Sequence, residues 1–299
     1  MILKRLLPPV AWPALLSASL FLTWLGFQAG FDPEMVVLVV YLMLALAILG
    51  LEWLMPHERS WQTSDGQTGN DLLHTVFGSA VPEFLAKGLV ILLFSNLAMH
   101  MATGSPGSLW PRDWFFPVQV ALAVFVADFG LYWAHRLGHE WMLFWRFHAL
   151  HHSPPRLWFI NTGRFHFVDS FKSTVFGMPL LILLNPPTEI IFWYVACLNY
   201  VGILSHCNIE LRPGILNYIF NTPGVHRWHH SRKLAESNHN YGEILMLWDL
   251  IFGTHFLPKH RPPADLGIDY VVPSGFLAQL AFPFTMRELA SGRGATDVD

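Results

Sequence analysis

The chain has 299 residues, of which 53% are hydrophobic and only 13% are charged, and its mean hydropathy is +0.38. This composition is too apolar for a disordered chain and too poor in charge for an ordinary soluble domain, so it indicates a membrane protein. A net charge of −3 provides no positive field for binding nucleic acid, and two cysteines are too few for a disulfide scaffold or a four-cysteine metal site. The 18 lysines and arginines are nearly matched by 16 histidines, an excess that needs an explanation.

The first half of the chain contains four apolar stretches, each long enough to cross the roughly 20-residue hydrocarbon core of a bilayer as a helix. They lie near residues 10–30, 35–55, 81–101 and 115–134. The first stretch follows Lys4 and Arg5 and lacks a clear small-residue cleavage site, so we interpret it as a membrane helix and not as a secretory signal.

The basic residues predict which side of the membrane each half of the chain occupies. Lys4 and Arg5 favour a cytoplasmic N-terminus, and four spans return the chain to the cytoplasm after residue 134. From Arg136 onward the chain carries 13 of its 18 lysines and arginines, which favours the same side. We therefore expect the second half to be cytoplasmic.

Histidines are concentrated directly after the fourth span, where 11 of the 16 lie between His135 and His239. Eight of them form three clusters, His135/His139, His148/His151/His152 and His226/His229/His230. Residues three and four positions apart share one face of a helix, so each cluster is predicted to direct its imidazoles at one spot. Imidazole suits iron, zinc and copper, and eight ligands exceed the needs of one ion, so the pattern predicts two metals.

Between the second and third clusters, residues 174–205 carry a single formal charge, Glu189. Pro186 and Pro187 interrupt this stretch near its middle, and proline cannot continue a helix. The pattern predicts a helical hairpin that enters the bilayer and returns to the same side. No His-Glu-x-x-His motif occurs, which excludes a protease site of that type, and an all-histidine dimetal site at a membrane face remains.

The order of these motifs resembles the fatty acid hydroxylase and sterol desaturase superfamily of integral-membrane, non-haem di-iron oxygenases. The resemblance runs from about Asp128 to Pro258. It includes Asp128-Phe-Gly-Leu-Tyr-Trp-Ala-His135 before the first cluster and Asn240-Tyr-Gly-Glu after the last. It implies an all-α integral membrane protein, in which about four transmembrane helices and a helical hairpin carry a cytoplasmic helical cap that holds the dimetal site.

The resemblance also implies two further ligands. His166 lies in Arg164-Phe-His166-Phe-Val-Asp169, which is similar to the family's Arg-x-His-Pro-x-Glu, and His206 lies where members often have His-x-Asn. His239 is an eleventh candidate that we favour less, because many members lack a histidine there. The expected metal ligands are His135, His139, His148, His151, His152, His166, His206, His226, His229 and His230.

Three carboxylates are candidate partners of these ligands. Asp128 lies seven residues before His135, on the same helical face, and histidine ligands commonly donate their second N–H to a carboxylate. An ion pair within the membrane helices is an equal alternative for Asp128. Asp169 and Asp249 are candidates for the same role towards other histidines. The five histidines without ligand spacing, which include His74, are expected at the surface or the membrane interface.

We expect one integral domain in three parts: a transmembrane stem (1–114), the catalytic region (115–258) and a C-terminal cytoplasmic tail (259–299). In the resembling family, two iron ions use O2 to hydroxylate or desaturate a lipid C–H bond, although purified protein can carry zinc. No Gly-x-Gly-x-x-Gly fingerprint or four-cysteine set occurs, so two electrons must come from a ferredoxin- or cytochrome-type donor with its reductase. Basic residues that could dock this donor or anionic lipid are Arg227, Arg232, Lys233, Lys259 and Arg261.

Two other functions compete with this prediction. A non-enzymatic metal-binding or transport protein would need ionisable residues at mid-membrane on several helices, and the predicted spans offer few. A zinc hydrolase needs only three ligands and an open position, fewer than the chain supplies. The substrate stays open among fatty acyl chains, sterols, carotenoids, ether lipids and amino-lipid head groups.

Overall fold

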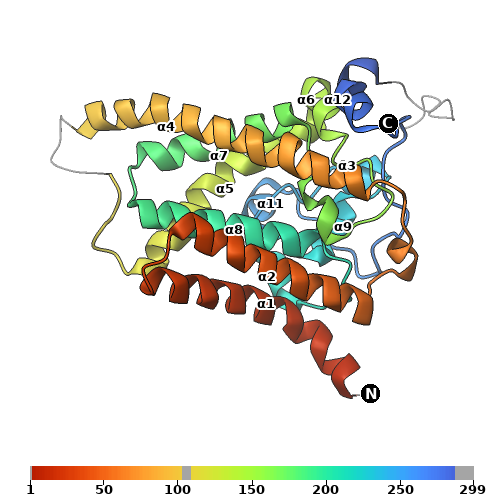
Figure 1. The fold of residues 1–299 in the computed structure, drawn as a ribbon. Coiled ribbons are helices and arrows are strands. Elements are labelled where there is room, and N and C mark those ends of the chain that lie inside the picture. Colours follow the sequence, from red (N-terminus) through yellow and green to blue (C-terminus); the bar gives the residue numbers. More distant parts are fainter. Residues whose placement is uncertain (1, 103–108, 287–299) are drawn as a thin grey trace.

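The computed structural model describes residues 2–102 and 109–286. Within these ranges the ordered backbone is helical, and the only strand-like pairings are three isolated bridges. The long helices are α1 (Ile2–Gln28), α2 (Pro33–Leu54), α4 (Val81–Ala102), α5 (Phe116–Glu140), α7 (Phe167–Leu183) and α8 (Thr188–His206). They lie roughly side by side as a bundle (Figure 1).

Most of the short helices gather at one end of this bundle, which is also the end where the described N-terminus lies (Figure 1). The short helices are η1 (Arg59–Gln62), α3 (Thr68–Leu73), η2 (His74–Ala80), α6 (Met142–His148), η3 (Phe159–Gly163), η4 (Gly214–Tyr218), α9 (Pro223–His229), α10 (Leu234–Ser237), α11 (Leu247–Phe252) and α12 (Phe276–Thr285). We call these short helices and their loops the cap. The cap includes α12, which lies in the segment expected to be a C-terminal tail, and residues 287–299 lie outside the described part of the chain.

In the described part of the chain five helices are long and apolar enough to cross a membrane, which makes this a membrane protein. They cover Leu7–Gln28, Pro33–Leu54, Thr68–Ser95, Phe116–Glu140 and Thr188–His206. The third joins α3, the π-helical turn η2 and α4 into one continuous helix. Outward-facing side chains on α2 and α4, such as Leu46 and Phe84, are exposed and apolar, as a lipid-facing surface requires.

Proline and local capping explain where these helices begin and end. The α2 helix begins at Pro33, and the Asp32 side chain caps it by accepting a 3.0 Å hydrogen bond from Met35 N. The α7 helix ends at Leu183, before Pro186 and Pro187, and α8 starts directly after them. The chain therefore reverses between α7 and α8 as predicted.

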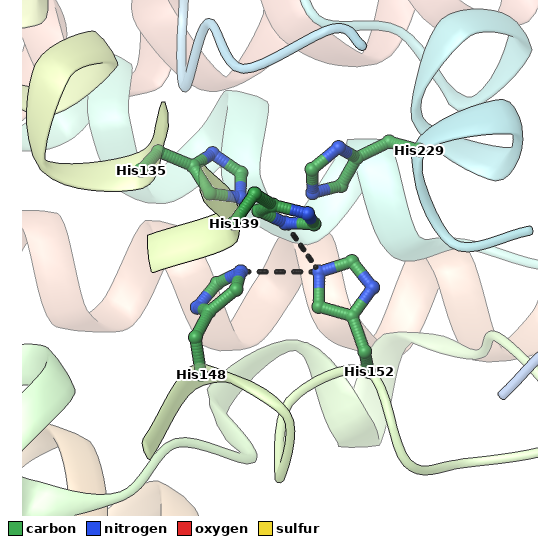
Figure 2. Close-up of side chains that lie close together, drawn as sticks. All are labelled: His135, His139, His148, His152 and His229. Carbon is green, nitrogen blue, oxygen red and sulfur yellow. Dashed lines mark hydrogen bonds between the residues drawn. The ribbon is translucent and has the colours of Figure 1, made fainter. Parts of the chain in front are cut away.

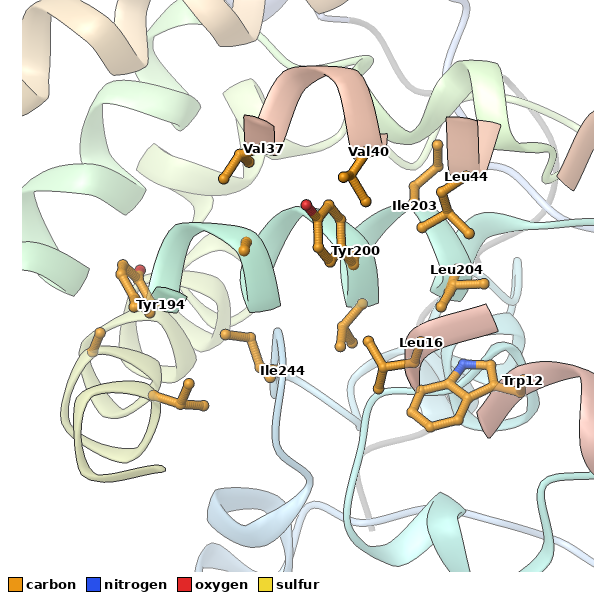
Figure 3. Close-up of a cluster of buried hydrophobic side chains, with 14 of the residues drawn as sticks. Trp12, Leu16, Val37, Val40, Leu44, Tyr194, Tyr200, Ile203, Leu204 and Ile244 are labelled. Carbon is orange, nitrogen blue, oxygen red and sulfur yellow. The ribbon is translucent and has the colours of Figure 1, made fainter. Parts of the chain in front are cut away.

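The main hydrophobic core surrounds α8, which packs against α1, α2 and α5. Figure 3 shows Tyr200 and Leu204 of α8 facing Val40 of α2 and Leu16 of α1. The Tyr200 hydroxyl lies 2.7 Å from the Thr23 hydroxyl, so a polar contact inside the apolar bundle is satisfied. This packing fixes the end of α8, where His206 lies.

The α5 and α7 helices cross at very close range because both carry glycine at the crossing. A Cβ on Gly130 would lie 2.0 Å from the carbonyl oxygen of Phe176, and one on Gly177 would lie 2.7 Å from Leu131. The α5 helix also continues to Glu140, past the predicted end of its span at residue 134. Its last turns therefore carry His135 and His139 into the cap.

Candidate metal centre

Nine histidines meet in two groups where α5, α8 and α9 converge with the segment after α6. Group one consists of His135, His139, His148, His152 and His229, and group two consists of His151, His206, His226 and His230. Within each group the candidate ligand atoms lie within 4.8 Å of one another, and every member is buried. The two groups adjoin, because the rings of His152 and His230 stack with their centroids 4.2 Å apart.

The spacing predicted that the imidazoles of each sequence cluster converge on one place. In the structure the histidines of the second and third clusters are instead divided between the two groups. In α9, His226 and His230 belong to group two and His229 belongs to group one. With 3.6 residues per turn, the side chains of His226 and His230, which are four residues apart, point only about 40° apart around the helix axis. The side chain of His229 points about 100° away from that of His230. The same division separates His148 and His152 from His151.

Hydrogen bonds at the outer edge of group one fix how its rings are oriented. His135 Nδ1 lies 2.9 Å from the carbonyl oxygen of Tyr241, and His229 Nδ1 lies 2.8 Å from that of His239. His148 Nδ1 lies 2.7 Å from Oδ2 of Asp169. Each acceptor requires a proton on Nδ1, which leaves the Nε2 lone pair free to face the centre of the group.

At the centre of group one the Nε2 atoms of the imidazoles face one another, and they carry too few protons to form hydrogen bonds among themselves. His152 Nε2 lies 3.1 Å from His139 Nε2 and 3.0 Å from His148 Nε2 (Figure 2). Among the described residues, Nε2 of His135 and Nε2 of His229 have no hydrogen-bond partner. Converging lone pairs on buried nitrogens are unfavourable unless a cation lies between them, so these residues fit a metal ion.

Burial favours the neutral, metal-binding form of five of the grouped histidines. It lowers the pKa of His148 to about 4, although Asp169 opposes this shift, and it lowers the pKa values of His151, His152, His229 and His230 well below 6.5. No proton must therefore leave these rings at neutral pH before a metal binds.

Group two is held by a different set of partners. His226 Nε2 and His230 Nε2 lie 3.1 Å apart, and His206 Nδ1 lies 3.4 Å from the Asn161 side-chain oxygen. His151 Nδ1 has no hydrogen-bond partner among the described residues. Its ring instead stacks on Phe165, with centroids 4.1 Å apart and planes 7° from parallel.

The three carboxylates hold the site in two different ways. Asp169 contacts a histidine of group one directly, as described above. Asp128 accepts hydrogen bonds from Ile244 N and Leu245 N, at 2.8 and 3.1 Å, and Asp249 accepts from Tyr241 N and Gly242 N, both at 2.8 Å. These two residues therefore hold the loop that carries the Tyr241 carbonyl, and their side-chain hydrogen bonds within the described residues go to this loop and to Thr254, not to a candidate ligand.

Glu243 belongs to the same loop and was missed by the sequence reasoning. Its Oε1 lies 3.1 Å from His135 Nδ1, beside the Tyr241 carbonyl. The signal was available in principle, because Glu243 follows Asn240-Tyr-Gly directly in the family-like motif. Carboxylates and carbonyls that accept the outer N–H of a ligand histidine commonly set its orientation.

Two of the candidate ligands lie outside both groups. His166 is buried, but its Nδ1 accepts a hydrogen bond from Val168 N and its Nε2 lies 3.2 Å from the Leu280 carbonyl oxygen, so both ring nitrogens are occupied. The His239 ring packs against Phe256, with centroids 4.9 Å apart, and only its backbone carbonyl serves the site.

Two further expectations need correction. Arg227 cannot dock a partner, because it is 2% exposed and donates to the Cys207 and Ile209 carbonyls, at 2.8 and 2.9 Å, which ties α9 to the end of α8. His74 is not at the surface but fully buried, where Nδ1 lies 3.1 Å from the Phe165 carbonyl and Nε2 lies 3.0 Å from Gln279 Oε1.

The fold and the site define a multi-pass membrane protein with two adjoining all-histidine groups at one end of a helical bundle. The family model for fatty acid hydroxylases matches residues 120–254, which contain all nine grouped histidines. An ornithine lipid hydroxylase of Rhizobium tropici is 43% identical over 286 residues, covering 92% of this chain and 83% of the relative. The chain belongs to the fatty acid hydroxylase/sterol desaturase superfamily, and it is an oxidoreductase.

Other relatives match about half of the chain. Human alkylglycerol monooxygenase is 33% identical over 146 residues, which cover 49% of this chain and 32% of the relative. A very-long-chain aldehyde decarbonylase of Arabidopsis thaliana is 30% identical over 178 residues, 54% of this chain and 28% of the relative. No solved structure matches the chain.

Proposed function

We propose that the chain is a membrane-bound, non-haem di-iron oxygenase that uses O2 and two external electrons to hydroxylate a C–H bond of a lipid. The observation that carries this proposal is the pair of adjoining histidine groups with converging, buried nitrogens. Hydroxylation is favoured over desaturation because relatives carry the names ornithine lipid hydroxylase and alkylglycerol monooxygenase. The likeness to the first covers most of both chains, so an ornithine lipid is the first substrate to test.

The ligand set that we propose is the nine grouped histidines, without His166 and His239. An iron pair held there would supply the reduction of dioxygen and the attack on an unactivated C–H bond. The protein itself orients the ligand histidines and excludes water from the site. Asp169, the Tyr241 carbonyl and the His239 carbonyl each fix the ring of one ligand, and burial of every grouped histidine excludes bulk water.

We further propose that the cap lies on the cytoplasmic side and that a ferredoxin- or cytochrome-type donor docks there. The excess of lysine and arginine after residue 136 supports this orientation. Lys233 and Arg261 have largely exposed side chains, and their surface ion pairs with Glu236 and Glu58 are weak enough to exchange for an acidic donor, unlike the buried contacts of Arg227.

The direct test is a set of alanine variants of the full chain in lipid nanodiscs, loaded with iron and supplied with a donor, O2 and ornithine lipid. His229→Ala in group one and His226→Ala in group two should each lose metal and form no oxygenated lipid. His239→Ala is the matched control, because it removes a neighbouring ring but keeps the carbonyl that serves His229, and it should retain both. Full turnover in His229→Ala, or no product from the iron-loaded wild type, would overturn the proposal.

A further inference from the structure

The cap helix α11 lies beside the membrane-spanning helix α5 and not beyond its end. In Figure 1 it lies farther towards the middle of the bundle than α9 or α12. The Trp248 ring of α11 packs on Phe125 and Phe129 of α5, with centroids 4.6 and 4.8 Å apart. Phe125 precedes His135 by ten residues, which is about 15 Å along a helix that rises 1.5 Å per residue. The α11 helix therefore extends from the level of the metal centre towards the middle of the span.

The loop before α11 has the backbone pairing that such a position requires. Asp128 and Asp249 accept hydrogen bonds from four backbone N–H groups of residues 241–245, and Met246 N donates to the Ile219 carbonyl oxygen at 3.0 Å. Irregular backbone at membrane depth is stable only where protein groups satisfy its hydrogen bonds, because hydrocarbon offers none. A carboxyl group in a spanning helix likewise needs partners, and Asp128 has them in this loop. The loop can therefore enter the bilayer.

The face of α11 that does not pack on α5 is apolar and exposed. Leu247, Leu250 and Ile251 are 38%, 45% and 57% exposed. At the same level of α5, the Phe125 ring that Trp248 contacts is itself 38% exposed, so the two apolar surfaces are continuous. Because α5 is long and apolar enough to cross the membrane, its exposed apolar surface faces lipid. This lipid-facing surface continues from α5 onto α11.

We propose that α11 is immersed in the acyl chains of the leaflet on the cap side, so that this part of the cap contacts lipid and not water. The continuity with the surface of α5 favours hydrocarbon as the partner over another protein. The loop directly before α11 carries the Tyr241 carbonyl and Glu243, both of which contact His135. The bilayer therefore reaches the segment that orients a proposed metal ligand.

The test measures the surroundings of a nitroxide label on α11, in the full chain reconstituted into lipid vesicles. The label is attached to Ile251→Cys in a background without the two native cysteines, and Leu250→Cys is a second position on the same face. Electron paramagnetic resonance measures how often the label collides with O2, which dissolves in hydrocarbon, and with a neutral nickel chelate, which stays in water.

Two exposed positions calibrate the measurement. Leu46→Cys on the spanning helix α2, where the native side chain is 69% exposed, reports acyl chains. Lys233→Cys, where the native side chain is 76% exposed, reports water. The ratio of O2 to chelate collisions on α11 should match that at Leu46→Cys and exceed that at Lys233→Cys at least about tenfold, because moving a polar chelate into hydrocarbon is costly. Circular dichroism like that of the wild type verifies that each labelled protein is folded.

Two outcomes would overturn the proposal. A collision ratio like that of Lys233→Cys would place α11 in water. Low accessibility to both O2 and the chelate would show that a second copy of the chain or another protein covers the helix. The readout does not involve turnover, so a failure of the hydroxylase function would leave the assignment of α11 to the bilayer unchanged.

Discussion

At the scale of single residues, the most consequential contact is the buried chain that runs from Lys172 through Asp169 to His148. Lys172 Nζ lies 2.5 Å from Asp169 Oδ1, and the other carboxylate oxygen faces the His148 ring. Burial alone would raise the pKa of Asp169, but Lys172 and His148 together hold it well below its usual range. Asp169 therefore stays charged and keeps the proton of His148 on Nδ1.

We predict that Asp169→Asn lowers metal affinity at group one about 10- to 100-fold, because one neutral amide oxygen replaces the two carboxylate oxygens that serve His148 and Lys172. The same change leaves Lys172 buried without its partner, so the free energy of unfolding should fall by about 3–5 kcal/mol. Metal titration and thermal unfolding of the full chain measure the two effects.

The double variant Asp169→Asn/Lys172→Met separates the effect on metal affinity from the effect on stability. Removing the buried ammonium should restore most of the lost stability but none of the lost metal affinity. Recovery of metal binding in the double variant would show that Asp169 acts through stability alone.

At the scale of elements, the π-helical turn η2 positions group two from outside. It brings His74 and Gly78 against the Phe165 carbonyl, and a Cβ on Gly78 would lie 2.0 Å from that oxygen. The Phe165 ring is the one that stacks on His151. A distortion of one membrane helix therefore fixes a ring in the cap, and π-turns of this kind are frequent at functional sites.

We predict that Gly78→Ala displaces Phe165, destabilises the fold by about 1–3 kcal/mol and weakens metal binding at group two more than at group one. Gly88→Ala in the same continuous helix is the matched control, since nothing lies within 4 Å of its new Cβ. That change should leave metal binding intact and stabilise the helix slightly. Equal effects of the two alanines would refute the role given to η2.

At the scale of the whole molecule, the bundle has two ends, which the proposed orientation places on opposite sides of the membrane. The loop between α1 and α2 lies at the end of the bundle opposite the cap (Figure 1). Phe31 in this loop is exposed, as is Lys233 in the cap.

We predict that a membrane-impermeant maleimide labels Lys233→Cys only in inside-out vesicles and Phe31→Cys only in right-side-out vesicles, in a background without the two native cysteines. The excess of basic residues in the cap is the physical reason. The reverse pattern would place the cap outside, and labelling of both cysteines from one side would contradict the transmembrane arrangement.

The sequence by itself determined the features that depend on local rules. Apolar length predicted the membrane helices, Pro186 and Pro187 predicted the reversal between α7 and α8, and histidine spacing predicted eight of the nine grouped histidines. Each of these signals is contained within a few helical turns, so it does not depend on how distant segments pack.

Only the tertiary structure decided which histidines share a group. His229 lies in the same group as His135, whereas His226 and His230 lie in the other group. The reason is that different faces of α9 pack against different histidines. The family resemblance suggested His166 as a ligand, yet its Nε2 atom is hydrogen-bonded to the Leu280 carbonyl oxygen of α12. Arg227 has a charged side chain typical of a surface, yet it is buried against backbone carbonyls. Such pairings join residues far apart in the chain, and they depend on how the helices pack together, which local spacing does not encode.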